Sequence, residues 1–453
     1  MRTDWLGNGL SVGEAGTVAG IDDFIEGFLG YETKAANILK AVEAEPEACL
    51  PNAYAALFYM FLESQEAPNL ARPFLEAAER AAPGASERER MTVAATRAWV
   101  DNDIPRAVKI ADMIAQAYPR DLAMVKTAQY HHFNLGNAAG MLAIAETVEE
   151  SNLDIPYMHG LVAFGYEQCH LLPEAEKAAW RAIELKRKEP WAQHALAHVF
   201  LTTGRIEAGV AFLEEASTNW TDLNSFMSTH NWWHLALNYI SLGRYEDTLA
   251  LYDRHVWGIW KEYSQDQIGA VSLLLRLELA GVDVGERWRD VAEHMKGRTN
   301  DFVQPFITMQ YVYGLARAGY AEADELMDNL HAFARTAPLF VRSIWEDVAV
   351  PACEGLVAHA RGAHEQVVAR MGAAISRIME AGGSHAQRDL FEQVLLDSMI
   401  RSGRYSTAQQ MLEIRRGYHP DSVPANTALA LVYGELGLPR EAARARARLR
   451  PRA

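Results

Sequence analysis

Apolar positions along this chain recur with helical spacing, and the recurrence is interrupted at regular intervals. At the first four interruptions a small or turn-forming residue ends one helical stretch and an apolar residue two positions later opens the next, and similar punctuation returns further along the chain. The first four such residues lie 34 positions apart, and the later ones follow at steps of 34 to 43. They are Asn102, Gly136, His170, Gly204, Gly243, Gly281, Gly319, Gly362, Gly403 and Gly437. The pattern predicts an all-α chain of consecutive helix pairs.

A 34-residue helix-turn-helix unit is characteristic of tetratricopeptide repeats. We therefore expect an α-solenoid of tetratricopeptide-like helix pairs, curled tightly into a superhelix with a central groove or cavity. Three regions are expected: a divergent helical region at 1–85, regular repeats at 86–255, and longer-period repeats ending in a basic capping helix at 256–453.

Two consecutive segments of the regular region each carry histidines at positions i and i+4. One segment contains His194 and His198, and the other contains His230 and His234. This spacing puts both imidazoles of a pair on one face of a helix. In tetratricopeptide arrays the first helix of each unit lines the groove. Counting back from the glycine that ends each of these helices predicts that all four imidazoles face one region of that groove.

Such a cluster supports three interpretations. Three or four neutral imidazole nitrogens can bind zinc or a similar divalent cation, and an open coordination position would then activate water. Without a metal, imidazoles can act as general acid and base, or as donors to an anionic substrate. Alternatively, the histidines are satisfied polar partners inside a packed superhelix. The motif His-Glu-x-x-His is missing and Asp253 lies on another helix, so spacing alone does not select the metal.

A second candidate site reads Gly-Gly-Ser-His-Ala-Gln-Arg-Asp at 382–389. The two glycines are expected to end one helix, Ser384 to cap the next, and Gln387 to complete a capping box. Capping does not explain Arg388, a cation in a first turn where the helix dipole disfavours positive charge. Either Asp389 or another carboxylate compensates this charge, or Arg388 binds a ligand anion beside free backbone N–H groups.

Other candidates come from inward-facing repeat positions and from the segment after residue 251. The candidate catalytic residues, which are also the possible metal ligands, are His194, His198, His230 and His234. The candidate ligand-binding residues are Lys126, Tyr157, Glu167, Trp233, Asp253, His255, Gln387, Arg388 and Asp389.

Composition limits the partners. The chain has 43 Lys and Arg against 59 Asp and Glu, and its formal net charge of −16 disfavours a nucleic-acid partner. Three widely spaced cysteines fit a reducing compartment, and we find neither a signal-peptide pattern nor an apolar run long enough to span a bilayer. We expect a cytoplasmic protein that binds neither nucleic acid nor a membrane. Its arginine-rich end, from Arg440 to Arg452, is expected to be a solvated cap or a docking element.

Several segments together resemble the family of tetratricopeptide repeat protein 38, over about residues 86–420. They are His-Asn-Trp-Trp-His-Leu-Ala-Leu at 230–237, Tyr-Asp-Arg-His at 252–255, the segment around His194 and His198, and the 382–389 segment. The resemblance implies the tetratricopeptide fold but no particular reaction. This chain has Gln129-Tyr130 where the family pattern has a His-Asp pair, and Met309 to Val312 where the family has an Asn-Asp-x-His element. Either its substrate differs or it uses fewer acid-base groups.

These features favour an enzyme acting on a small anionic organic substrate, with the histidines near the reacting atoms and Arg388 holding a carboxylate or phosphate. Hydrolase, lyase and isomerase chemistry remain open, with either no cofactor or a divalent metal such as zinc. The alternative is a peptide-binding adaptor, although only Lys126 supplies the inward basic side chain that such a groove requires. A third possibility is a structural scaffold that associates with itself or with a protein partner.

Overall fold

The computed structural model describes residues 2–449, which are almost entirely helical. The strands within this range are β1 (Arg2–Thr3) and β2 (Gly9–Leu10), which pair antiparallel with Arg2 opposite Leu10. The expected all-α solenoid is confirmed. Arg450 and Arg452 of the basic end lie outside the described residues.

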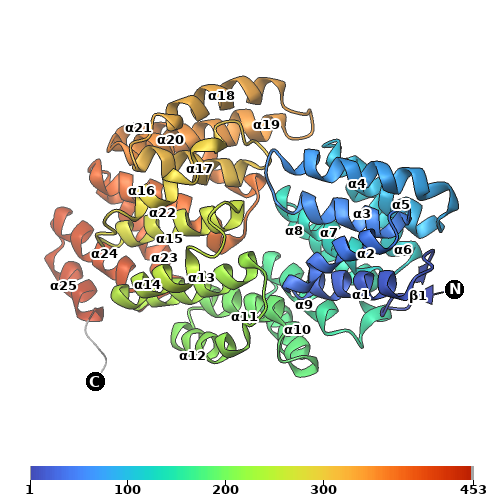
Figure 1. Cartoon of the computed structure of the whole chain (residues 1–453). Coiled ribbons are helices and arrows are strands. Elements are labelled where there is room, and N and C mark those ends of the chain that lie inside the picture. Colours follow the sequence, from blue (N-terminus) through green and yellow to red (C-terminus); the bar gives the residue numbers. More distant parts are fainter. Residues whose placement is uncertain (1, 450–453) are drawn as a thin grey trace. The chain divides into compact units, whose positions relative to one another are not determined.

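The chain divides into two compact units, and Figure 1 labels their helices. Unit 1 comprises Met1–Leu196 and Asn219–Met227, and unit 2 comprises Ala197–Thr218 and Ser228–Ala453. The division falls inside helix α11 (Pro190–Thr202) and near the start of α13 (Ser225–Ser241).

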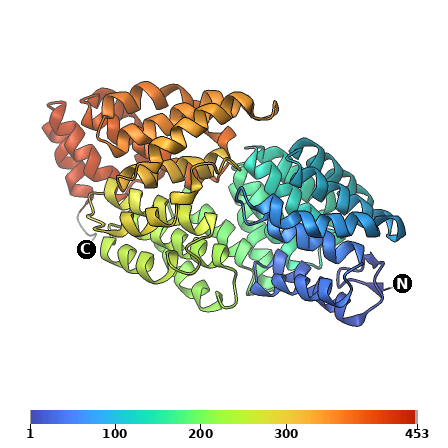
Figure 2. The same ribbon diagram turned by 45° about the horizontal axis from the view of Figure 1, so that its top comes forward.

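Unit 1 consists of consecutive helix pairs that begin with α1 and α2. Its helices are α1 (Ala15–Leu29), α2 (Ile38–Ala44), α3 (Cys49–Met60), α4 (Ala67–Ala81), α5 (Glu87–Val100), α6 (Ile104–Ala117), α7 (Leu122–Asn134), α8 (Ala138–Glu149), α9 (Pro156–Gln168) and α10 (Leu172–Leu185). Short 3-10 segments are η1 (Thr33–Asn37), η2 (Ala82–Gly84) and η3 (Glu150–Asn152). Figure 2 shows these helices from a second side.

Unit 2 continues the pairing with longer connections. Its helices after α11 and α13 are α12 (Ile206–Ala216), α14 (Tyr245–Leu251), α15 (Ser264–Leu279), α16 (Arg287–Glu293), α17 (Pro305–Arg317), α18 (Glu322–Thr336), α19 (Arg342–Ile344), α20 (Val350–Ala360), α21 (His364–Ala374), α22 (His385–Arg401), α23 (Tyr405–Tyr418), α24 (Val423–Glu435) and α25 (Pro439–Arg448). Shorter helical segments are η4 (Ser217–Asn219), η5 (Tyr252–Val256), η6 (Lys296–Arg298), η7 (Trp345–Ala349) and η8 (Ile375–Ala381); η5 and η7 are π-helical.

The turns between paired helices follow the predicted punctuation. All ten punctuating residues have φ between 58° and 86°, including the two that are not glycine, Asn102 and His170. The next residue in each case donates its N–H to a carbonyl five positions earlier, as Arg205 does to Phe200 and Arg244 does to Tyr239. This left-handed turn satisfies the last carbonyls of the helix and reverses the chain. The predicted helix ends are therefore confirmed.

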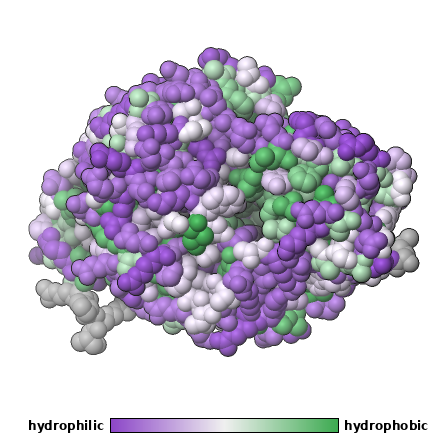
Figure 3. All heavy atoms as spheres, in the orientation of Figure 1, coloured by the Kyte–Doolittle hydropathy of each residue, from purple (hydrophilic) through white to green (hydrophobic). Residues whose placement is uncertain are grey.

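Each unit has an apolar core of its own. In unit 1 the core runs from α1 to α9, and Phe24 and Tyr54 are fully buried in it. In unit 2 the main core runs from α13 to α22 around Trp233 and Trp345, and a smaller one joins α22 to α25. Hydrophilic residues dominate the face of α18, α20 and α21 visible in Figure 3, whereas hydrophobic residues gather over α3 and α8. None of the described helices is both long and apolar enough to cross a lipid bilayer.

Two glycines of α1 make a matched test of its packing. A Cβ at Gly27 would lie 2.5 Å from the backbone nitrogen of Ala35, whereas one at Gly16 would meet nothing within 4 Å. We expect Gly27→Ala to lower the free energy of unfolding by about 1–3 kcal/mol through this clash. Gly16→Ala should raise it by up to about 1 kcal/mol, because alanine favours the helix. Denaturant unfolding of both variants tests this, and equal effects would contradict the packing of α1 on η1.

Candidate functional site

Three of the four predicted imidazoles come together inside unit 2. Helix α11 carries His198, and α13 carries His230 and His234 one turn apart. The Nε2 atoms of His230 and His234 lie 3.2 Å apart, and the ring centroids of His198 and His234 lie 4.5 Å apart. Each of the three rings offers a nitrogen within 4.8 Å of the others. The predicted convergence of the two helices' histidines is therefore present within this unit.

The fourth histidine, His194, lies one turn before His198 on the same helix, within unit 1. The His194 ring stacks on Trp191, with centroids 4.4 Å apart, and contacts the ring of Phe164 at 5.0 Å. Aromatic packing thus orients His194.

The cluster is buried. The exposed fractions of His198, His230 and His234 are 1%, 8% and 0%. Burial, together with the neighbouring His198, lowers the pKa of His230 to about 3. A ring with this pKa carries no proton to donate as an imidazolium at neutral pH. It is instead in the neutral form that binds metal ions.

The 3.2 Å separation between the two Nε2 atoms has two physical explanations. One ring can donate its N–H to the other, or both nitrogens can bind one ion. Zinc–imidazole bonds of 2.0–2.1 Å in a tetrahedral site place neighbouring nitrogens roughly 3.3 Å apart, so the observed spacing already matches the metal geometry. The two nitrogens of His230 and His234, with the ring of His198 beside them, therefore offer three candidate ligands from two helices.

The surroundings of the cluster link it to the second candidate segment. The indole of Trp233 stacks on His230, with centroids 5.2 Å apart and planes at 10°. The guanidinium of Arg276, on α15, lies 5.7 Å from the Trp233 ring. Arg276 also donates to the carbonyl of Ala386 at 2.5 Å and to Asp389 at 3.3 Å, both on α22. One buried side chain thus connects α13 to the first turn of α22.

The first turn of α22 shows which groups compensate the charge of Arg388. Ser384 and Gln387 form the predicted capping box. Arg388 donates to the carbonyl of Gly383 and to Nδ1 of His385, so backbone and imidazole acceptors face its charge. Burial favours the neutral form of Asp389, but Arg415 at 2.6 Å and Arg276 outweigh it and hold its pKa below the ordinary value.

Arg276 and Arg415 are residues that sequence reasoning missed. Neither residue belongs to a motif. Each lies on a different helix from its partner Asp389, Arg276 on α15 and Arg415 on α23. Two further histidines, His359 and His364, were also missed, although their positions on either side of Gly362 are a visible signal.

Two candidates of unit 1, Lys126 and Tyr157, bind helix α1 of the same chain. Lys126, on α7, donates to the carbonyls of Phe28 and Leu29 at the C-terminal end of α1. The Tyr157 hydroxyl, on α9, lies 3.3 Å from a carboxylate oxygen of Glu26 on α1. A cation satisfies the last carbonyls of a helix and favours its dipole, so Lys126 acts as a cap for α1. Burial lowers the pKa of Lys126 well below its ordinary value.

The remaining candidates lie outside the imidazole cluster. Glu167 is buried in unit 1 and accepts a hydrogen bond from Gln168 at 2.5 Å. Asp253 pairs with Arg287 at 2.6 Å near the surface of unit 2. His255 stacks on Trp232, with ring centroids 4.1 Å apart.

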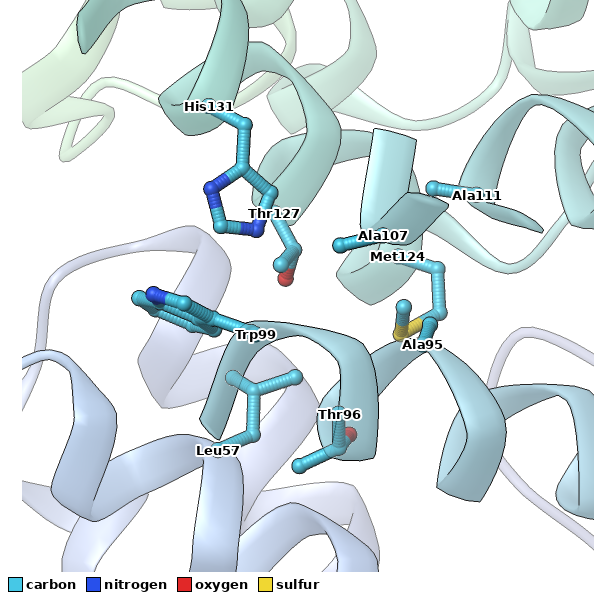
Figure 4. A pocket seen from close by; sticks show the side chains of 9 residues that line it. All are labelled: Leu57, Ala95, Thr96, Trp99, Ala107, Ala111, Met124, Thr127 and His131. Atoms are coloured by element: carbon cyan, nitrogen blue, oxygen red, sulfur yellow. The ribbon is translucent and has the colours of Figure 1, made fainter. Parts of the chain in front are cut away.

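A narrow space in unit 1 lies between α3, α5, α6 and α7 (Figure 4). Its walls are mostly apolar, and it is too narrow to hold a water molecule. His131 is 3% exposed there, packs edge-on against Trp99 at 4.6 Å, and has a pKa lowered to about 3 by burial and by His132. We interpret this space as core packing with a neutral histidine.

No family model matches the chain. A solved structure titled "Human IFIT1 dimer with PPP-AAAA" is 14% identical over 94% of this chain and 94% of that chain, with a TM-score of 0.41. Human IFIT1 dimer with m7Gppp-AAAA is 12% identical over 97% of this chain and 90% of that one, with a TM-score of 0.37. The structure of Naa15/Naa10 bound to HypK-THB is 13% identical over 81% and 63%, with a TM-score of 0.25. At these TM-scores no site or ligand carries over to this chain.

A buried carboxyl in unit 1 gives a pH test. Glu189 precedes α11, accepts the N–H of Ala192, and has a pKa raised by burial from 4.5 to about 8. Between about pH 4.5 and 8 the Glu189 carboxyl is ionised in the unfolded chain but still protonated in the folded chain. The free energy of unfolding should therefore fall as pH rises through this range. Glu189→Gln should remove this fall, and it should be more stable than the parent at pH 8.5 by a few kcal/mol, at about 1.4 kcal/mol per pKa unit. Urea unfolding at pH 5 and 8.5 measures it.

The control is Glu76→Gln, at an exposed glutamate of α4, which should follow the parent at both pH values. A parallel pH dependence for Glu189→Gln and the parent would contradict a protonated Glu189.

Proposed function

We propose that this chain is a tetratricopeptide-type interaction scaffold that holds a transition-metal ion at His198, His230 and His234. The observation that carries the proposal is the 3.2 Å approach of two buried imidazole nitrogens, with a third imidazole beside them. Three nitrogen ligands on two helices favour zinc or another divalent ion of the same preference. Such an ion would tie α11 to α13.

Burial favours a structural ion over general acid catalysis in this proposal. His234 is fully buried and the lowered pKa of His230 leaves it no proton to transfer at neutral pH. A general acid or base works best with a pKa near the operating pH. We also propose membership of the tetratricopeptide repeat protein 38 family, which the contacts of Arg276 support: the segments at 230–237 and 382–389 that carry the resemblance lie at α13 and α22, and both contact this arginine.

A second candidate function is binding of a small anion beside the histidines, as the sequence pattern led us to expect. Two buried donors favour it: Nε1 of Trp233 and Nε of Arg276, for which no hydrogen-bond partner is found among the described residues. Buried donors in native proteins normally meet protein, water or ligand acceptors. A carboxylate or phosphate would satisfy both.

Peptide binding by unit 1 is less favoured. Inward side chains of α7 and α9 already hold α1, so a peptide would have to displace that helix. Partner binding by the scaffold is therefore proposed through other surfaces.

The metal proposal predicts zinc-dependent stability. Zinc at about a hundred times its Kd should stabilise the protein by about 2.7 kcal/mol. For a unit of this size that corresponds to a melting temperature roughly 5–10 °C higher than in chelator. His234→Ala, and the milder His230→Gln, should remove the part of this difference that is due to the His198, His230 and His234 site. Differential scanning calorimetry with metal analysis of the purified protein measures both quantities.

The matched control is His331→Ala on α18, whose side chain is 41% exposed. It should keep the full response to zinc. Zinc-free protein with the same melting temperature in zinc and in chelator would show that the imidazoles only share a proton.

The anion candidate predicts a separate signal. Phosphate should raise the melting temperature of the parent, and Arg276→Gln or Trp233→Phe should reduce that rise. A rise that is unchanged in both variants would assign phosphate to another surface.

A further inference from the structure

Unit 2 contains a second cluster of ligand-type side chains, at the turn between α20 and α21. His359 and His364 lie on either side of Gly362, whose φ of 75° reverses the chain and brings the two rings to a centroid separation of 5.6 Å. Asp397, on α22, reaches the same place, and its Oδ2 lies 3.1 Å from Nε2 of His359. Each residue offers one ligand atom within 4.8 Å of the other two.

Both imidazoles are held through the same ring nitrogen. Nδ1 of His359 lies 3.3 Å from the hydroxyl of Tyr313, on α17, and Nδ1 of His364 lies 3.3 Å from the hydroxyl of Ser398. In metal sites the nitrogen that does not bind the ion is normally held in this way, which fixes the tautomer and the ring orientation. The arrangement leaves Nε2 of each ring as the candidate ligand atom, and that of His359 lies next to Asp397.

The carboxylate of Asp397 retains binding capacity beside its arginine partner. Arg401 donates from Nε to both oxygens of Asp397, at 2.8 and 3.0 Å. Two carboxylate oxygens together have about four lone-pair positions, so an ion can bind beside the arginine.

The exposure of the cluster differs from that of the buried imidazoles. The side chains of His359 and Asp397 are 10% and 18% exposed, and Arg401 is 57% exposed. An ion can therefore enter from solvent and keep water in its remaining coordination positions. A purely structural hydrogen bond between His359 and Asp397 accounts for two members of the cluster but not for the orientation of His364.

We propose that His359, His364 and Asp397 form an open binding site for a divalent d-block ion. Two imidazoles and one carboxylate with vacant positions are the ligand set of zinc and non-haem iron(II) sites. This site is independent of the ion proposed at His198, His230 and His234, since it uses other helices.

Zinc binding by the full-length chain tests the proposal. Equilibrium dialysis should give one equivalent that His364→Ala and Asp397→Asn remove, while far-UV circular dichroism stays unchanged. Tyr313→Phe and Ser398→Ala keep all three ligands and lose only the orienting hydroxyls, so zinc affinity at this site should fall about 10–100-fold. His331→Ala again serves as the control with full binding.

The two sites give separable results. His234→Ala should leave the equivalent at His359, His364 and Asp397 in place, and His364→Ala should leave any equivalent at the buried imidazoles in place. Parent protein that loses all its zinc through His234→Ala alone would overturn this inference without affecting the first proposal. Unchanged zinc affinity in both Tyr313→Phe and Ser398→Ala would also overturn it, because the hydroxyls would then have no ligand to orient.

Discussion

The left-handed turn that closes each helix pair is the constraint on which the rest of the structure depends. A residue such as Gly204 or Gly243, with φ near 70°, ends one helix and sends the next back along it. Because this turn sets the residue at which a helix stops, it also sets which faces of successive helices meet. The contact between His198 and His234 follows from this register. At Gly362 the same turn brings His359 and His364 together directly.

Buried polar and charged side chains connect several helices of unit 2. Neutral imidazoles can be buried at moderate cost, and burial lowers the pKa of His230 so that its ring is neutral. A buried charge requires compensation, and Asp389 receives it from Arg276 and Arg415. Helices α13, α15, α22 and α23 are therefore connected by aromatic and ionic contacts as well as by apolar packing. The polar chain through Arg276 makes the surroundings of the imidazoles depend on a helix far along the sequence.

The two units use their inward-facing positions differently. In unit 1, Lys126 and Tyr157 hold α1, so this face stabilises the chain's own N-terminal region. In unit 2, the corresponding positions of α11 and α13 carry His198, His230 and Trp233. The same repeat geometry therefore serves intramolecular packing in one unit and a candidate ligand cluster in the other. Side-chain chemistry at a few positions, with the backbone nearly unchanged, makes this difference.

Local patterns determined the helix ends and the face shared by His230 and His234, because turn conformation and i,i+4 spacing depend only on neighbouring residues. The capping box of Ser384 and Gln387 belongs to the same class. Only the tertiary structure decided that Arg276 compensates Asp389, that Lys126 caps α1, and that Asp397 joins His359. These contacts join residues far apart along the chain, and they depend on how successive helices stack. No local sequence pattern encodes that stacking, since many packing angles suit the same apolar periodicity.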